Sequence, residues 1–291
     1  MTQQQKSYLY ATLAILAWSS VSTAFKISLR HLTPIGLLLI SSLSATMFLL
    51  LYKGLSGSEE EHSFSFNLKK SLAPALLNPF FYYLVLFVAY SRLRAQEAQA
   101  LNYTWAIVLS LFSIILLRER FRFKDLAALI ISFLGVIIIS TKGRVFSLDF
   151  DDALGTALAA GSSIIWALYW IINMRDRRET ITKLSYSFGL GFVFILLTGF
   201  LLRDPIFLPQ SQMAVALISG IYVGIFEMGL TFVLWMRALD LSESTAKVSN
   251  LIFITPFISL IFIRFALGEA IHFSTVLGLL LIIASNVLQK A

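Results

Sequence analysis

The sequence contains no cysteine and few charged residues. Of its 291 residues, only 13% are Asp, Glu, Lys or Arg, against roughly 25% in soluble domains. The missing thiols exclude a disulfide framework, a thiolate metal site and a cysteine nucleophile. The scarcity of charge excludes an ordinary soluble enzyme and a disordered chain. The net charge of +7 is spread between apolar runs rather than gathered in the basic stripe of a nucleic-acid-binding surface. We therefore expect an integral membrane protein.

Motifs of soluble catalysis are also missing. The sequence has no GxxxxGK[ST] loop, which excludes ATP hydrolysis by a P-loop of its own, and it has neither a GxSxG elbow nor an HExxH zinc motif. The histidines His31, His62 and His272 stand in loops or at a span edge, without the spacing of metal ligands. We therefore expect no enzyme activity, no cofactor and no metal.

Hydrophobic windows, by contrast, run along the whole chain. A helix needs roughly 17–25 apolar residues to cross the hydrocarbon core, and most of these windows reach that length. They do not alternate as the strands of a membrane β-barrel do. We predict an all-α integral membrane protein with ten transmembrane helices, in the windows 7–25, 32–52, 71–91, 98–117, 126–141, 153–174, 184–202, 205–235, 248–263 and 270–289.

The basic residues predict the orientation. The side of the membrane shared by both termini carries 14 Lys and Arg residues and the other side carries 7, with Lys26 and Lys247 left out because they lie at span ends. Cytoplasmic loops carry the excess of Lys and Arg in membrane proteins. Both termini are therefore expected in the cytoplasm.

The two halves of the chain resemble each other at a nearly fixed distance. A shift of 148 residues places Trp18 on Trp166, and a shift of 150 residues places Glu119 on Glu269. Each half would hold five spans, and because five is odd the second copy would cross the membrane in the opposite direction. We predict five-helix repeats at residues 1–146 and 147–291 with inverted topology, which is typical of secondary transporters. The alternative is chance similarity among apolar helices.

These features resemble a known family. Ten spans in two copies, a tryptophan in the first helix of each copy and a glutamate after the fourth are similar to the drug/metabolite transporter superfamily, EamA type. The run Asn102-Tyr103-Thr104-Trp105 resembles the Asn-Tyr-x-Trp-Pro motif of YddG-like amino-acid exporters, with Ala106 at the proline position. The resemblance covers essentially the whole chain. It implies an inner-membrane exporter of amino acids or similar metabolites, with a central substrate cavity.

Several aromatic residues lie away from the membrane interfaces. Trp18 and Trp166 fall near the middle of their spans, and Trp105 falls about one helical turn from the centre. An indole N–H in hydrocarbon needs a hydrogen-bond partner, which a polar neighbour or cavity water supplies. Helix packing explains any single one of these residues, but the set favours a pocket for small zwitterions. The predicted substrate-cavity residues are Trp18, Ser22, Asn78, Tyr82, Tyr83, Asn102, Tyr103, Trp105, Trp166, Tyr169, Tyr222, Glu227 and Asn250.

Glu227 is the one carboxylate deep within a span. A charge there costs on the order of a few kcal/mol, so the residue should face the interior of the bundle. It is predicted either as a proton-coupling or substrate-ammonium site, or as a neutral carboxyl bonded to a neighbouring helix. Pro79 and Pro256 each remove a backbone hydrogen bond, and Gly220 and Gly224 form a GxxxG step. These four residues are predicted hinges, with a packing adjustment as the alternative.

The sequence thus predicts a secondary transporter that exports amino acids or related small metabolites by alternating access. Its expected partners are a small-molecule substrate and membrane lipid, without nucleic acid, and a proton is the candidate coupling ion. An importer or exchanger of drugs or other metabolites, and a membrane scaffold without transport, are the alternatives, followed by a membrane enzyme.

Overall fold

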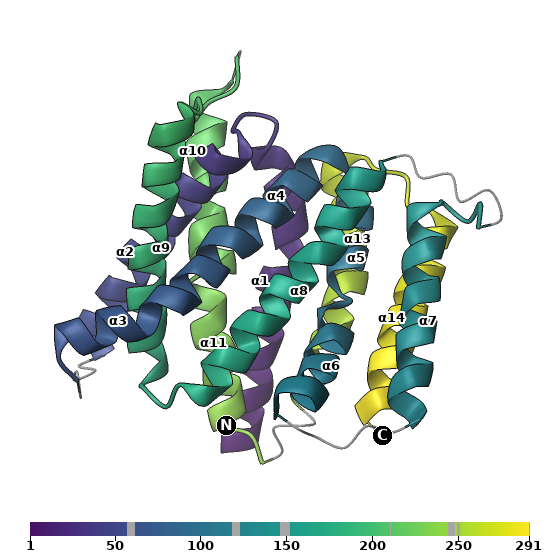
Figure 1. Ribbon diagram of the computed structural model, residues 1–291, viewed down its shortest axis with the longest axis horizontal. Helices are drawn as coiled ribbons and strands as arrows, with labels where there is room; N and C mark the ends of the chain where they lie inside the picture. Colours follow the sequence, from purple (N-terminus) through teal and green to yellow (C-terminus); the bar gives the residue numbers. More distant parts are fainter. Residues whose placement is uncertain are drawn as a thin grey trace. The chain divides into compact units, whose positions relative to one another are not determined.

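The protein is helical in a computed structural model that describes residues 1–56, 62–117, 123–145, 152–209, 211–243, 248 and 251–290 (Figure 1). Within these ranges, seven helices are long and apolar enough to cross a membrane, and three shorter apolar helices occupy Leu126–Ser140, Leu251–Leu267 and Phe273–Leu288. The same ranges contain no β-strand, only an isolated bridge between Leu32 and Phe207. The all-α prediction is confirmed, whereas ten spans and inverted topology stay predictions.

The chain forms two compact units. Unit 1 comprises Met1–Phe80 and Arg178–Gly268, and unit 2 comprises Phe81–Arg177 and Glu269–Ala291. Each unit therefore takes helices from both halves of the sequence. The predicted boundary between repeats, at residues 146 and 147, lies outside the described residues and stays a prediction.

Unit 1 is built around its first helix. Helix α1 contacts α10, α11 and α13, while α9 packs against α2 and α3. The π-helical turn η2 approaches α2 so closely that a Cβ on Gly224 would overlap the Ser41 carbonyl oxygen, and one on Gly220 would lie 2.8 Å from Ile40 Cγ2. Both glycines therefore lie at a close helix contact, and their hinge role stays a prediction. The elements are α1 (Gln3–Ser28), α2 (Pro34–Ser56), α3 (Phe64–Ala75), η1 (Leu76–Phe81, continuing into unit 2), α9 (Thr180–Leu202), α10 (Met213–Tyr222), η2 (Val223–Glu227), α11 (Leu230–Asp240), η3 (Leu251–Ile254) and α13 (Thr255–Leu267).

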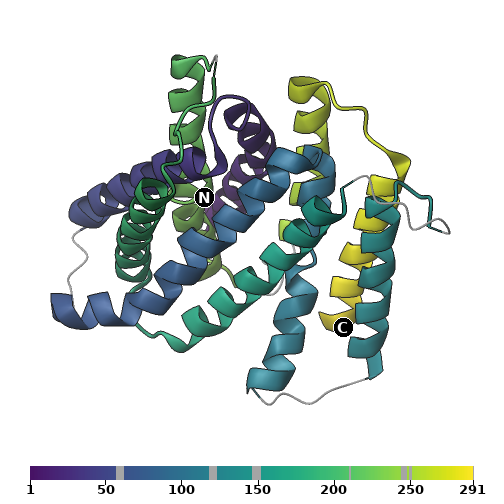
Figure 2. The same cartoon turned by 45° about the horizontal axis from the view of Figure 1, so that its top comes forward.

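Unit 2 has α8 in the corresponding role. Helix α8 contacts α4, α5 and α6, while α7 packs along α14, and this pair stays side by side in both views (Figures 1 and 2). A Cβ on Gly135 of α7 would lie 2.7 Å from the Gly278 carbonyl oxygen of α14, so the two backbones meet closely. The elements are α4 (Tyr82–Arg92), α5 (Ala95–Asn102), α6 (Trp105–Leu117), α7 (Phe123–Ser140), α8 (Ala153–Arg175) and α14 (Phe273–Lys290).

Four of the predicted spans depart from a regular α-helix within the described residues. In the third, η1 contains Pro79, and the backbone of Asn78 is extended (φ −143°, ψ 117°). In the fourth, a turn at Tyr103 and Thr104 separates α5 from α6. In the eighth, η2 and a two-residue turn separate α10 from α11, and in the ninth the 3-10 turn η3 leads into α13, with Pro256 in its first turn.

The interruptions occur at matching positions of the two halves. The shift of 148 residues places Asn78 on Phe226 in η2. The shift of 150 residues places Tyr103 on Phe253 in η3. The halves therefore share the positions of their helix breaks as well as those of their tryptophan and glutamate residues.

The first helices of the two halves begin with different caps. The side chain of Thr2 accepts from the Gln5 N–H at the start of α1, and the Gln5 side chain accepts from the Thr2 N–H. At the start of α8, the Asp152 carboxylate accepts from the Gly155 N–H at 2.7 Å and pairs with Arg92 at 3.0 Å. The hydrogen bond from Gly155, helped by Arg92 against a desolvation cost, lowers the pKa of the Asp152 carboxyl below its ordinary value.

Candidate functional site

The structure brings several predicted site residues together in an aromatic cluster of unit 2. Tyr82 of α4 stacks on Trp166 of α8 with ring centroids 4.5 Å apart, and Trp166 stacks on Tyr169 at 5.5 Å. Tyr83 meets Tyr82 edge-on at 4.7 Å. Trp170 meets Trp166 edge-on at 5.9 Å. The spacing i, i+3, i+4 puts the three rings of α8 on one face.

A polar chain joins this cluster to the interruption between α5 and α6. The Tyr82 hydroxyl donates to Asn102 Oδ1 at 3.3 Å, and Asn102 Nδ2 donates to Ser162 Oγ at 2.8 Å. In the turn itself, the Thr104 and Ser163 hydroxyls are 2.7 Å apart and share a hydrogen bond. Two side-chain bridges therefore hold the break in the fourth span against α8.

Burial separates packing residues from residues that a solute can meet. Tyr83 is fully buried, and Tyr82 and Tyr169 are 4% and 2% exposed, so these rings serve packing in this structure. Trp166 and Asn102 are only half-buried. They are the members of the cluster best placed to contact a small molecule. Tyr103 and Trp105 flank the same break and are also half-buried.

Trp18 belongs to a second aromatic group, in unit 1. Its ring meets Phe232 edge-on at 5.8 Å and Trp235 at a tilt at 5.6 Å, both on α11. The Tyr222 hydroxyl of α10 lies 2.6 Å from Ser20 Oγ of α1. The two groups place a predicted tryptophan in each unit, each in contact with aromatic rings of a neighbouring helix.

Three further predicted residues lie in unit 1. Ser22 is buried in α1, and Glu227 is the half-buried last residue of η2. Asn78 is fully buried, and neither its amide nitrogen nor its amide oxygen has a hydrogen-bond partner among the described residues. An unpaired buried polar group costs about 1–3 kcal/mol, so Asn78 is the predicted site residue that most needs another polar partner. Asn250 lies outside the described residues.

Sequence reasoning missed the hydroxyl partners of the cluster. Ser162 and Ser163 are not among the predicted site residues, because serine is common in membrane helices. Its hydroxyl can donate to a carbonyl of the preceding helical turn, as both hydroxyls also do here. A signal was nonetheless present, since Ser162 stands four residues before Trp166 and therefore on the same helix face. Trp170 follows Trp166 by four residues, so the sequence places it on the same helix face, although it is not among the predicted site residues.

A helical membrane bundle with matched interruptions, and with polar and aromatic side chains beside them, has the architecture of a membrane transporter. The model of the EamA-like transporter family matches the chain twice, at residues 5–141 and 153–288. The chain therefore belongs to the EamA-like transporter family.

Individual relatives agree with this assignment. The chain is 27% identical to an uncharacterized transporter of Archaeoglobus fulgidus, over 98% of both proteins. It is also 27% identical to the uncharacterized transporter YvbV of Bacillus subtilis, over 74% of this chain and 69% of YvbV. The aromatic amino acid exporter YddG of Ancylobacter novellus is 25% identical over 54% of this chain and 53% of its own.

A protein of known crystal structure has the same fold. It superposes with a TM-score of 0.65 and 20% sequence identity, over 98% of this chain and 96% of its own. Family, relatives and helices together make this chain a multi-pass membrane transporter with a small-molecule substrate.

Proposed function

We propose that the protein is a secondary transporter that exports amino acids or related small metabolites by alternating access. The observation that carries the proposal is the pairing of departures from regular α-helix, third span with eighth and fourth with ninth, at positions related by the repeat. In secondary transporters, interrupted helices in corresponding positions of two repeats form the substrate site near the membrane midplane.

Reciprocal packing supports the presence of two equivalent copies. The first helix of each half contacts the third and fourth predicted spans of the other half: α1 contacts α11 and α13, and α8 contacts α4 and α6. Two copies related by an inverted repeat would make the same contacts twice. The inverted repeat at residues 1–146 and 147–291 is therefore part of the proposal.

The chemistry beside the interruption of the fourth span suits an amino acid. Its ammonium group needs acceptors and its carboxylate needs donors, and the amide of Asn102 can offer both. The half-buried Trp166, which is stacked on Tyr82 and Tyr169, adds an aromatic ring whose exposed part can contact an aromatic side chain edge-on. The relative YddG is named an aromatic amino acid exporter, which supports the same substrate class.

The driving force is proposed to be the substrate gradient, with or without proton exchange. The sequence has no P-loop, and Glu227 in η2 is the proposed proton site. Export from the cytoplasm requires an orientation, and the ratio of 14 to 7 basic residues supports cytoplasmic termini. Reporter fusions after Lys290 should report the cytoplasm and fusions near Lys142 the outside; an external C-terminus would contradict the proposed orientation.

Transport in liposomes tests the substrate class. The purified protein is reconstituted and loaded with a panel of labelled aromatic and aliphatic amino acids, a nucleoside and a quaternary ammonium drug. Saturable flux of at least one amino acid is expected, inhibited by the same unlabelled compound. Asn102→Ala should reduce this flux, and Asn173→Ala, at the far end of α8, serves as the control. Flux of the drug or nucleoside alone would reject the amino-acid proposal, and absence of all flux from folded protein would reject the panel as substrates.

A further inference from the structure

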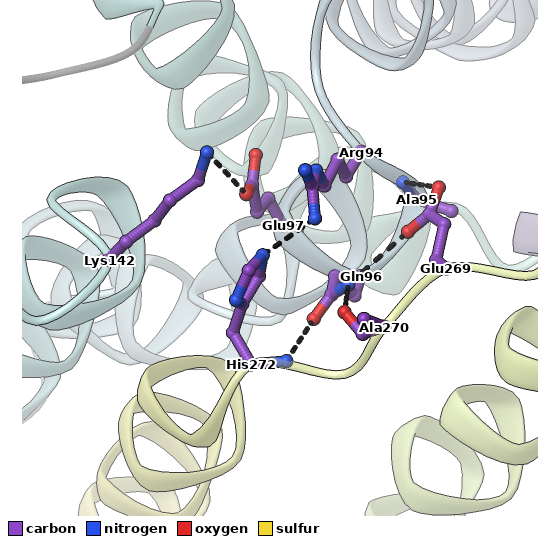
Figure 3. A network of polar contacts seen from close by, with 8 residues as sticks. All are labelled: Arg94, Ala95, Gln96, Glu97, Lys142, Glu269, Ala270 and His272. Carbon is purple, nitrogen blue, oxygen red and sulfur yellow. Dashed lines mark hydrogen bonds and ion pairs between the residues drawn. The ribbon is translucent and has the colours of Figure 1, made fainter.

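A polar junction outside the proposed substrate site ties the first turn of α5 to the segment before α14 (Figure 3). The Glu269 carboxylate accepts from the Ala95 N–H at 3.0 Å. Gln96 donates to the Ala270 carbonyl at 2.8 Å and accepts from the His272 N–H at 3.0 Å. We call these contacts, together with Arg94 and Glu97, the α5 junction.

The junction is specific because its central side chain, that of Gln96, is shielded from solvent. Gln96 is fully buried, and both ends of its amide are used by the segment 269–272. A buried amide that loses its partners carries the whole desolvation cost. Glu269 in turn supplies an acceptor and a negative charge to the N-terminus of α5, where both are favourable. The segment is therefore held at a defined place on α5.

The position of the segment 269–272 matters because the chain passes from unit 1 into unit 2 at its first residue. Unit 1 ends at Gly268 and unit 2 resumes at Glu269. Gly268 ends α13 in a left-handed conformation, with φ of 70°, which favours glycine. The α5 junction thus fixes the first residues that follow a backbone joint between the two units.

One contact of the junction depends on a proton. Arg94 NH1 lies 2.7 Å from His272 Nε2. A guanidinium is a donor only and stays charged, so the imidazole nitrogen must accept, and the ring must be neutral at that atom. A proton on Nε2 would place two donors and two positive charges face to face. Protonation of His272 at this atom and the Arg94 hydrogen bond therefore exclude each other.

The other charged groups at the junction are arranged around this pair. Glu97 of α5 is 6% exposed and lies 4.0 Å from Lys142, which follows α7. Glu269 is the second carboxylate of the junction (Figure 3). Among the described residues, α6 carries no charge. The charged residues within α7 and α14 lie at the end of each helix that is farther from the junction.

Two further charged sites belong to neighbouring segments of unit 2. Arg144 follows Lys142 by two residues, and Arg92 pairs with Asp152 at 3.0 Å at the start of α8. Among the described residues named here, the basic groups outnumber the carboxylates. An added proton on His272 therefore meets Arg94 directly and joins a region that is already positively charged.

We propose that His272 is a proton-binding site that locks the α5 junction when neutral and releases it when protonated. Acidification of the compartment that faces the junction then frees the joint after α13 and alters the transport rate. With the proposed orientation, that compartment is the outside. The proposal rests on transport activity, but neither on an amino-acid substrate nor on Glu227.

Hydrogen exchange tests the lock without any substrate. Amide exchange of residues 94–98 and 269–273 is measured in full-length protein at about pH 7.5 and about pH 5.5, on either side of the ordinary imidazole pKa of about 6.5, and corrected for intrinsic rates. Loss of one charge-assisted hydrogen bond predicts about tenfold faster exchange at the lower pH. Equal corrected rates at the two pH values would overturn the proposal.

Variants separate His272 from other titrating groups. His272→Gln keeps an acceptor for Arg94 and cannot be protonated, so its exchange and transport should lose the pH response. His272→Lys should exchange fast at both pH values. His31→Gln is the matched control, because His31 Nδ1 accepts from the Gln212 N–H at 3.2 Å, a neutral donor in unit 1.

A variant at a second residue of the pair, Arg94, provides a check that does not depend on the folding of the His272 variants. Arg94→Gln removes the opposing cation, so protonation of His272 should no longer speed exchange of the segment. A pH response that survives in both His272→Gln and Arg94→Gln would contradict the lock. If the exchange response follows the prediction while no panel compound is transported, the lock stands and the proposed substrate class fails.

Discussion

Helices α1 and α8 begin the two halves of the chain, and each carries a mid-helix tryptophan in a different environment. Trp18 of α1 meets Phe232 edge-on and Trp235 at a tilt. Trp166 of α8 is instead stacked with both Tyr82 and Tyr169. Equivalent positions of the repeat thus hold the same residue in two kinds of ring contact.

The hydroxyl groups beside the two tryptophans differ as well. Ser19 of α1 donates to backbone carbonyls, at 2.6 Å from Ile15 O and 3.1 Å from Thr255 O. Ser162 of α8 accepts from the Asn102 side chain. A carbonyl within a helix stays where it is, but a side-chain amide can turn toward a solute. We infer that α1 mainly holds its unit together, and that α8 offers the groups that recognise substrate.

Removal of the α8 tryptophan should give the largest effect. The loss of one aromatic contact with the substrate, worth about 0.5–1.5 kcal/mol, predicts up to about tenfold slower transport for Trp166→Ala, with a similar yield of folded protein. Trp105→Ala should act in the same direction. Trp18→Ala should change transport per folded molecule much less, measured as initial flux in liposomes. If Trp166→Ala and Trp105→Ala instead express poorly and melt early, the rings serve packing and the comparison fails.

Removal of the bridging amide should give the next largest effect. Asn102→Ala removes an acceptor of the Tyr82 hydroxyl and the side-chain donor to Ser162 Oγ, which should cost about 1–3 kcal/mol of unfolding free energy. Ser19→Ala removes donors to carbonyls that also serve the helix, and should cost about 0.5–1.5 kcal/mol. Denaturant unfolding in detergent measures both. Equal losses would show that the two hydroxyl environments are equivalent.

The interruptions of the third and eighth spans offer a third comparison. Asn78 lies in η1 of the third span and Glu227 is the last residue of η2 in the eighth, so one irregular segment holds an amide and the other a carboxyl. If Glu227 couples transport to protons, Glu227→Gln should abolish a few-fold pH dependence of flux at a fixed substrate gradient. Glu243→Gln, at an exposed carboxylate of the same unit, is the control. Superimposable pH profiles of wild type and Glu227→Gln would leave uniport.

The caps of the two helices should give the smallest effect. The pKa of Asp152 is lowered by the Gly155 N–H, so its contribution to stability is complete above the unfolded value of about 3.9 and is lost as pH falls through the folded pKa. Asp152→Asn should lower the melting temperature by about one to two degrees at neutral pH and by nothing under strong acid. Thr2→Val, at the neutral cap of α1, should lower the melting temperature by an amount that does not change with pH. Parallel pH profiles for both variants would contradict this difference.

The helices could be predicted from the sequence because membrane spans follow from local composition. Pro79 likewise marks the break in the third span. The break at Tyr103 and Thr104 contains neither proline nor glycine, so the local sequence does not indicate it. Thr104 bonds to the Leu101 carbonyl at 2.8 Å and to Ser163 of another helix, and that second partner is 59 residues away in the chain.

The site could be predicted only in part for the same reason. Trp166 and Tyr169 share a helix face, which spacing reveals. The stacking of Trp166 on Tyr82, and the bond from Asn102 to Ser162, depend on how α4 and α5 pack against α8. Each unit contains helices from both halves of the chain. This division depends on contacts between distant segments, which hydrophobic periodicity does not predict.

That division has a consequence for the order in which the protein is made. Helix α7 packs along α14, yet α14 begins 150 residues later in the chain. The ribosome therefore delivers α7 to the membrane long before α14, and unit 2 is completed only after α14 has been synthesised. A gene split between the halves would yield two polypeptides, neither of which holds all the helices of either unit.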